Sequence, residues 1–182
     1  ILTGRAIEAA VDQGEIAISP FEPACLGPNS YDFHLGTRCR TYDAPVLDSG
    51  RPNPSTVQLV PPEGLVLDPK RIYLWDTWEV IGSNRYVPII RARSSTARLG
   101  LFVHVTADMI DIGSINRLTL QLHAVVPVRV YPRMRVGQVT FWVCSGEIVP
   151  YAGKYRGIES PAGSLSYRDF EIGLSPLATT EK

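Results

Sequence analysis

A run of short segments rich in β-branched and aromatic residues, beginning near residue 65, constrains the fold more than any other feature. Gly, Pro, Asp and Asn separate these segments, as turns separate strands. Many short strands joined by brief turns are typical of a β-barrel or a β-sandwich with one or two small helices attached. The predicted strands span residues 65–68, 71–81, 85–93, 100–108, 117–126, 128–132, 135–144 and 146–151.

The N-terminal third of the chain carries weaker signals. Thr3 is a residue type that caps helices and Gly14 one that ends them, so we expect a short helix between them. Residues 30–43 alternate polar and apolar side chains, which predicts a half-buried strand. Residues 47–64 are rich in turn formers and predict an exposed loop. Residues 94–100, SSTARLG, predict one helical turn.

Length and composition exclude several classes of protein. A chain of 182 residues with 45% hydrophobic residues suits one domain, residues 1–182, with a core of its own. The 18 basic residues equal the 18 acidic ones, which argues against a nucleic-acid polymer as partner. No apolar run approaches the roughly 20 residues that span a bilayer, so we expect no membrane partner. The Ser-, Gly- and Pro-rich segment of about 151–182 is expected to be partly mobile until a ligand binds.

The cysteines and the N-terminal segment predict a cytoplasmic protein. Cys25, Cys39 and Cys144 are odd in number and widely spaced, so they are expected to be free thiols in a reducing compartment rather than disulfides or a metal centre. The first residues lack the basic and apolar regions of a secretion signal.

The polar cluster at Arg93, Ser94 and Ser95 suits a phosphate. A guanidinium offers a bidentate fork, and the hydroxyls add donors. Arg98 follows Ser94 by four residues and would share its helical face. The alternative for the same residues is a capped helical turn with an ion pair that binds nothing.

The stretch RSSTARLGLFVHVTADMID resembles the core motif of the dCTP deaminases, a family within the dUTPase superfamily. The segments PNSYDFHLGTR, PPEGLVLDPKRIYLWDTWEVI, VYPRMRVGQVTF and GKYRG also resemble family segments, so the likeness covers nearly the whole chain. It implies a mainly β, dUTPase-like barrel of the β-clip type with small helices. It also implies a homotrimer with active sites between subunits and a deoxypyrimidine triphosphate, dCTP or dUTP, as substrate.

The resemblance further implies roles for individual residues. Arg93, Ser94 and Ser95 would contact the triphosphate, and Arg98 would hold the attacking water. The backbone at Ala107 would read the pyrimidine edge. The remaining implied contacts are Asp111 beside the sugar, and Lys154 and Tyr151 closing over the phosphates. Mg²⁺ would be bound through the nucleotide phosphates rather than by protein side chains.

Gln121 is the largest departure from the family pattern. The family's general base is a glutamate in a strand, and gapless alignment from Arg93 places Gln121 at that position. Deamination needs a group that moves protons between water, ring and leaving ammonia, and a neutral amide has no usable pKa near 7. Loss of general acid–base help typically costs about 10²–10⁴ in rate. An amide still binds water or a uracil edge, because it both donates and accepts hydrogen bonds.

The sequence leaves three functions open. The first is a dCTP deaminase, impaired by Gln121 or rescued by Asp108 or Asp111 as base. The second is a diphosphatase of the dUTPase type, in which Asp111 would activate water for attack on phosphorus. The third is a non-catalytic nucleotide-binding relative. Further departures near the expected site are Ile112, Ala124, Arg133 and Ile158.

A zinc-dependent deaminase is not indicated. That class uses an H-x-E motif with a paired P-C-x-x-C. His34, His104 and His123 are not followed by glutamate two residues on, and the chain has no cysteine pair. His104 and His123 lie in predicted strands and are expected in the core or at a subunit interface.

Overall fold

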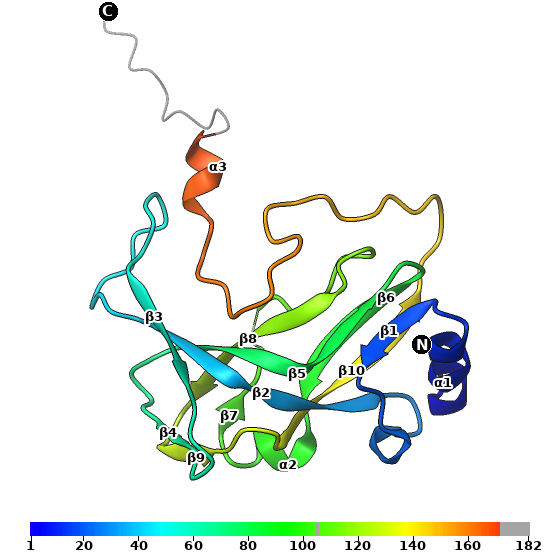
Figure 1. The fold of residues 1–182 in the computed structure, drawn as a ribbon, viewed down its shortest axis with the longest axis horizontal. Helices are drawn as coiled ribbons and strands as arrows, with labels where there is room; N and C mark the ends of the chain where they lie inside the picture. The colour runs from blue at the N-terminus through cyan, green and yellow to red at the C-terminus, as the bar shows by residue number, and fades with distance from the viewer. Residues whose placement is uncertain (105, 172–182) are drawn as a thin grey trace, which may run out of the picture.

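A computed structural model describes residues 1–104 and 106–171 of the chain. The described part is mainly β, with small helices, as predicted (Figure 1). The helices are α1 (Gly4–Asp12), the 3₁₀ turn η1 (Pro23–Cys25), α2 (Ser94–Ala97) and α3 (Tyr167–Glu171). The strands are β1 (Ile16–Ser19), β2 (Tyr31–Tyr42), β3 (Ser55–Leu59), β4 (Leu65–Leu67), β5 (Tyr73–Ser83), β6 (Tyr86–Ala92), β7 (Leu101–Phe102), β8 (Asn116–Ala124), β9 (Val128–Val130) and β10 (Arg135–Val143).

Eight of these strands form one curled sheet that nearly closes into a barrel. The order along the sheet is β6-β10-β2-β5-β8-β7, with β1 paired to β5 and β3 paired to β2. All these pairings are antiparallel, and β4 and β9 form a separate antiparallel pair. The dUTPase-like barrel expected from the motifs is therefore confirmed.

Alternation along β8 positions the candidate site. Leu118, Leu120 and Leu122 are buried in the core, whereas Thr119 and Gln121 are only partly buried. Successive side chains of a strand point to opposite faces, so Thr119 and Gln121 share the face away from the core. Each buried leucine stabilises the fold by roughly 1.5–3 kcal/mol, and a register slip would move these leucines out of the core.

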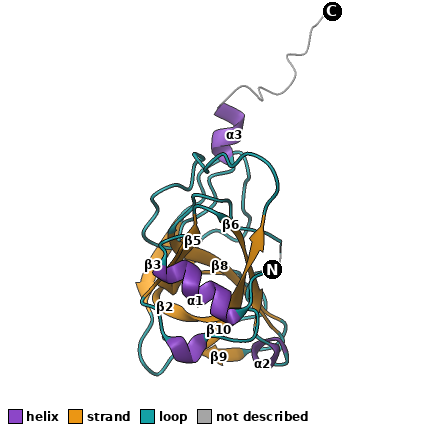
Figure 2. Cartoon of the chain, turned by 90° about the vertical axis from the view of Figure 1, so that its right-hand side faces the viewer, coloured by secondary structure: helices purple, strands orange, loops and turns teal. Residues whose placement is uncertain are grey.

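The helix expected between Thr3 and Gly14 is present. The backbone N–H of Ala6 donates to Thr3 Oγ1 at 3.4 Å, so Thr3 is the N-cap. Gly14 has a φ of +72°, the left-handed conformation that commonly ends a helix. Figure 2 shows α1 lying against the outside of the barrel.

Three expectations about strands and loops are wrong and one strand was not predicted, because backbone pairing between distant segments decided the outcome. The predicted loop 47–64 contains β3, whose backbone pairs with β2. β1 was not predicted, and it forms by pairing with β5 more than sixty residues away. Of the described residues within 100–108, only Leu101–Phe102 pair as a strand, and 146–151 form none.

The turn before β10 holds an unusual backbone. Arg133 has a φ of +66°, a conformation that favours glycine. Its guanidinium lies 3.7 Å from the centroid of the Trp78 ring, on which Arg117 also packs. This cation–π contact helps offset the backbone cost of a non-glycine residue at this position.

Cys25, Cys39 and Cys144 are all free thiols. Across 1–104 and 106–171, every helix is too short to cross a bilayer.

Candidate functional site

A cavity of about 500 Å³ lies on the face of β8 opposite the core. Thr119 and Gln121 form part of its wall, together with side chains from the neighbouring strand β5 and from the loop between β7 and β8. Ala107 lies in that loop, so the structure brings Ala107 and Gln121 to the same cavity, and the two also line an adjoining hollow. Ala107, whose backbone is expected to read the pyrimidine, and Gln121, which stands where the family has its general base, therefore lie at one cavity within a single chain.

The C-terminal segment closes this cavity. Residues 155–164 cross its mouth and contribute Tyr155 and Ile158 to the lining. Polar side chains of the sheet hold the backbone of the segment: Arg40 Nε donates to the carbonyl of Pro161 at 2.7 Å. Arg38 donates to the carbonyl of Glu159, and the hydroxyls of Thr119 and Tyr42 accept from backbone N–H groups at the far end of the segment. Residues 172–182, the end of the segment predicted to be partly mobile, lie outside the described residues.

Gln121 makes no side-chain hydrogen bond with the described residues. Its amide lines the cavity, and its β5 neighbour across the sheet is Leu74, which offers no polar side-chain partner. A polar side chain on a half-buried surface is normally hydrogen-bonded. The free amide is therefore available to a ligand in the cavity.

His104 is a second polar group of the cavity wall. Its Nδ1 is buried and has no hydrogen-bond partner among the described residues. Burial lowers the pKa of His104, while the backbone of Ala107 and the charge of Asp108 oppose this shift. The imidazole is thus favoured in its neutral form, in which it is able to accept or donate a hydrogen bond to a ligand.

The phosphate cluster expected at 93–98 lies elsewhere. Arg93 is the N-cap residue of α2, Ser94 and Ser95 are exposed in its first turn, and Arg98 is its C-cap residue. Figures 1 and 2 place α2 at the opposite end of the barrel from α3 and the C-terminal segment. These residues and the Gln121 cavity are therefore not brought together within one chain.

An ion pair holds the Arg93 side chain in place. Arg93 Nε lies 3.0 Å from Asp32 Oδ2, and Arg135 approaches the same carboxylate oxygen at 3.8 Å. The ion pair considered as the alternative from sequence is thus present. The Arg93 side chain keeps 33% of its surface exposed, and the neighbouring hydroxyls are free to contact solvent or a ligand.

Asp111 and Tyr151 lie along a second hollow of about 470 Å³, which shares Ile110 with the first cavity. Asp111 is exposed and forms no ion pair with any residue of the described ranges. Tyr151 is fixed beside it, because its backbone N–H donates to the carbonyl of Ile112 at 2.7 Å. Asp108 differs from Asp111, since its carboxylate pairs with Arg91 at 3.2 Å.

Lys154 lies in the same C-terminal segment as Tyr151. Its ammonium pairs with Asp169 of α3 at 2.5 Å. The carboxylate of Asp169 thus holds the Lys154 ammonium at the outer end of the segment. A phosphate would have to compete with this carboxylate for the ammonium.

Sequence reasoning missed several residues of the cavity. Thr119 precedes Gln121 by two residues, so the alternation of the strand was a signal that could have identified it. His104 was expected in the core or at an interface, and the structure places it in the lining of the cavity. Tyr155 and Ala162 join the cavity only through the path of the C-terminal segment, for which the sequence carries no local signal.

Comparison with known proteins identifies the family of the chain. The family model described as dCTP deaminase-like matches residues 1–144. The chain is 40% identical over 172 residues to a protein of Clostridium beijerinckii named "dCTP deaminase, dUMP-forming", covering 94% of this chain and 99% of that protein. A protein of Cytophaga hutchinsonii with the same name is 39% identical over 172 residues, covering 94% and 99% of the two chains.

A solved structure shares the fold. The crystal structure of 2′-deoxycytidine 5′-triphosphate deaminase from Agrobacterium tumefaciens superimposes with a TM-score of 0.62 at 21% identity. The match covers 79% of this chain and 48% of that chain, so the present chain spans about half the length of that protein.

Proposed function

The chain belongs to the dCTP deaminase-like family, and on that premise we propose that it is a hydrolase of deoxypyrimidine nucleoside triphosphates, with dCTP or dUTP as substrate. The observation that carries the proposal is the cavity that joins Ala107 to Gln121 beneath the C-terminal segment. The base would lie against the backbone at Ala107 and the amide of Gln121. The sugar would lie toward Asp111, whose hollow adjoins the cavity.

The triphosphate site would be completed by a neighbouring subunit of a homotrimer. Arg93, Ser94, Ser95 and Arg98 lie at the end of the barrel away from the C-terminal segment, so one chain alone does not supply both halves (Figure 1). In the trimer, the Arg93 fork and the two hydroxyls of one subunit would face the cavity of the next. Arg98 would orient the attacking water, and Lys154 and Tyr151 would close over the phosphates.

We assign Mg²⁺ to the nucleotide rather than to the protein. Triphosphate oxygens supply the hard oxygen ligands that Mg²⁺ prefers, and bound water completes the shell. The ion would neutralise phosphate charge alongside Arg93.

Gln121 is expected to slow deamination. In that reaction water adds to C4 of cytosine, a proton passes from the water to the ring or the leaving group, and ammonia departs. The free amide of Gln121 would hold the water or the base edge, but it has no carboxylate to carry the proton. We therefore propose that the chain binds its nucleotide normally and deaminates dCTP poorly.

Diphosphate release is the second candidate activity, and one observation favours it. Asp111 is an exposed carboxylate with no ion-pair partner across the described ranges, so it is free to accept a proton from water. Water would attack phosphorus, the bond to the leaving pyrophosphate would break, and a monophosphate would remain. The relatives named "dUMP-forming" yield such a monophosphate, and Gln121 is not needed for this step.

The experiment that separates these functions is a product assay. The purified chain is incubated with dCTP and with dUTP in the presence of Mg²⁺, and the nucleotides are separated by ion-exchange chromatography. dUTP and ammonia from dCTP would show deamination, and a monophosphate with pyrophosphate would show diphosphate release. Binding without either product would show a non-catalytic relative.

Binding is measured in parallel by calorimetry. Arg93→Ala is expected to abolish nucleotide binding, because it removes the phosphate fork. Arg5→Ala, at an exposed position of α1, serves as the matched control. Unchanged affinity in Arg93→Ala would contradict the proposed phosphate site.

A further inference from the structure

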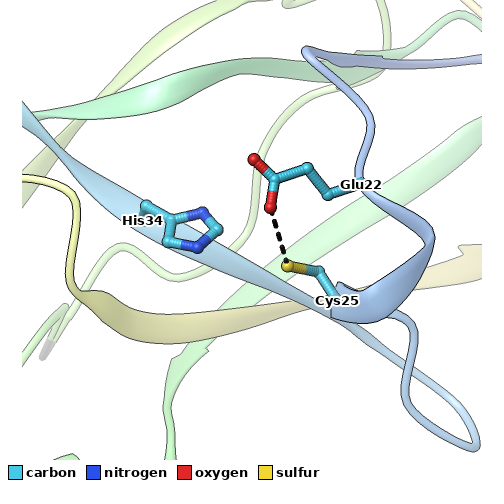
Figure 3. A group of neighbouring side chains, drawn as sticks. All are labelled: Glu22, Cys25 and His34. Carbon is cyan, nitrogen blue, oxygen red and sulfur yellow. Dashed lines mark hydrogen bonds between the residues drawn. The ribbon is translucent and has the colours of Figure 1, made fainter.

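A second cluster of chemically reactive side chains lies away from the nucleotide cavity. Glu22, Cys25 and His34 each offer one ligand atom, and these atoms all lie within 4.8 Å of one another. Figure 3 shows Glu22 and Cys25 on the segment that passes beside β2, with the His34 ring facing them from that strand. None of the three lines the cavity that holds Gln121.

We propose that Glu22, Cys25 and His34 form a zinc-binding site, with Glu79 as the carboxylate that orients the His34 ring. A thiolate, an imidazole and a carboxylate are the ligand set that Zn²⁺ prefers in proteins. Three protein ligands leave the fourth tetrahedral position to water. The cysteine spacing alone predicted no metal centre, and the fold brings Cys25 beside the other two ligands.

The contact between Glu79 and His34 is the observation that points to a metal. His34 Nδ1 lies 2.5 Å from Glu79 Oε1, and the backbone N–H of His34 donates to Glu79 Oε2 at 3.0 Å. Glu79 is 1% exposed, so both bonds are fixed within the core. Histidines that bind zinc typically donate their other ring N–H to a carboxylate in this way. Because Nδ1 is engaged, Nε2 is the nitrogen left for the ion.

The segment that carries the other two ligands is already anchored to β2. The backbone N–H of Glu22 donates to the hydroxyl of Tyr31 at 3.0 Å, and the N–H of Cys25 donates to the carbonyl of Glu22 at 2.9 Å. Cys25 is 2% exposed, and its Sγ lies 3.9 Å from Glu22 Oε2. Ligands of tetrahedral zinc are about 3.5 Å apart. The exposed Glu22 side chain is free to make most of the adjustment.

Charges around Cys25 favour a cation. Glu22 and Glu79 lie near the thiol, whereas the nearby carboxylate of Asp32 is already paired with Arg93 and Arg135. A divalent ion would neutralise this excess of negative charge and stabilise the thiolate.

The test uses the full chain without a polyhistidine tag, stripped of metal with a chelator and then equilibrated with ZnCl₂. Bound zinc is measured by mass spectrometry after gel filtration, and the affinity by competition with a chromophoric chelator. We expect one zinc per chain. Glu22→Gln, at an exposed position, is expected to weaken zinc binding by at least about 10–100-fold, the range for loss of a group that only orients a ligand. Glu63→Gln, another exposed glutamate, is the control and should bind zinc as the wild type does.

Cobalt supplies an independent readout of the thiolate. Co²⁺ bound to Cys25 should give a sulfur-to-metal charge-transfer band that is absent in Cys25→Ser and present in Cys39→Ser, which removes another buried thiol. A wild-type chain that retains no zinc after gel filtration would overturn the site. Equal zinc affinities in the wild type, Glu22→Gln and Cys25→Ser would also overturn it. Neither readout involves a nucleotide, so the result is independent of the proposed hydrolase activity.

Discussion

If the proposed function holds, the amide of Gln121 leaves nucleotide binding intact and slows deamination. Replacing it by a carboxylate, Gln121→Glu, restores a group that moves protons at the same place in the cavity. We expect ammonia release from dCTP to rise by about 10²–10⁴, the usual contribution of general acid–base catalysis. The measurement is a coupled assay for ammonia with dCTP and Mg²⁺.

The control for this substitution is Gln121→Asn, which keeps the amide and should stay as slow as the wild type. If Gln121→Glu binds dCTP as tightly as before and releases no additional ammonia, the amide is not what limits deamination.

His104 is expected to make stability depend on pH. Burial lowers the folded-state pKa of His104. Above the unfolded-state pKa of about 6.5 the ring is neutral in both the folded and the unfolded chain, so its protonation does not change the free energy of unfolding there. As pH falls below that value, the unfolded chain takes up a proton that the folded chain resists. Stability is therefore lost as pH falls toward the depressed folded-state pKa.

Urea unfolding at pH 7.5 and pH 5.5 measures this loss. His104→Gln is neutral at both values and should show a smaller loss between them than the wild type. His123→Gln controls for the removal of one histidine. An unchanged loss in His104→Gln would show that other groups set the acid sensitivity.

The C-terminal segment is held to the sheet by side chains rather than by strand pairing. Arg40 donates to the Pro161 carbonyl and to Ser55 Oγ, each at 2.7 Å. Arg40→Met removes both bonds, so the segment should detach more often. We expect faster cleavage by trypsin after Lys154 and Arg156, measured by mass spectrometry over time.

Arg5→Met, which removes an arginine from the exposed face of α1, should be cleaved in this segment at the wild-type rate. Equal rates in Arg40→Met and Arg5→Met would mean that Arg40 does not secure the segment.

Close packing between β10 and β2 depends on one glycine. A Cβ at Gly137 would lie 2.2 Å from the Phe33 ring and 2.7 Å from the Arg91 carbonyl. Gly137→Ala should therefore lower the free energy of unfolding by roughly 1–3 kcal/mol, the typical cost of overpacking. Urea denaturation checks this value.

Gly50→Ala is the matched comparison, since a Cβ there makes only ordinary contacts, the nearest at 3.5 Å. A loss of stability as large in Gly50→Ala as in Gly137→Ala would contradict the packing argument.

At the scale of the whole molecule, the proposed site needs two subunits. Arg93→Ala disables the α2 half, and Lys154→Ala disables the half that carries the cavity. Each variant alone should bind nucleotide poorly. The two variants are then mixed so that their subunits exchange. A site is intact only where a Lys154→Ala subunit supplies the fork and an Arg93→Ala subunit supplies the cavity. Random assembly of trimers should therefore restore about a quarter of the sites. Calorimetry measures the restored binding, and analytical ultracentrifugation measures the trimer.

The control mixes Arg93→Ala with a chain that carries both substitutions, which leaves no intact cavity half facing an intact fork. Restoration in that mixture, or a monomeric chain in the ultracentrifuge, would rule out a shared site.

The sequence by itself determined the features that local patterns encode. Alternation along the strands placed Leu118 and Leu120 in the core and Gln121 on the other face, since the period of a strand depends only on backbone geometry. The cap at Thr3 and the turn at α2 are equally local. The motif of residues 93–111 was sufficient to indicate the family, which the comparisons confirmed.

The tertiary structure decided everything that depends on pairing between distant segments. β1 and β3 exist because β5 and β2 satisfy their backbone groups. Side chains of the sheet hold the C-terminal segment over the cavity, whose lining includes no residue of α2. The same long-range packing brings Glu22 and Cys25 to His34. Contacts of this kind arise from the free energy of the whole packed chain, which no short stretch of residues contains.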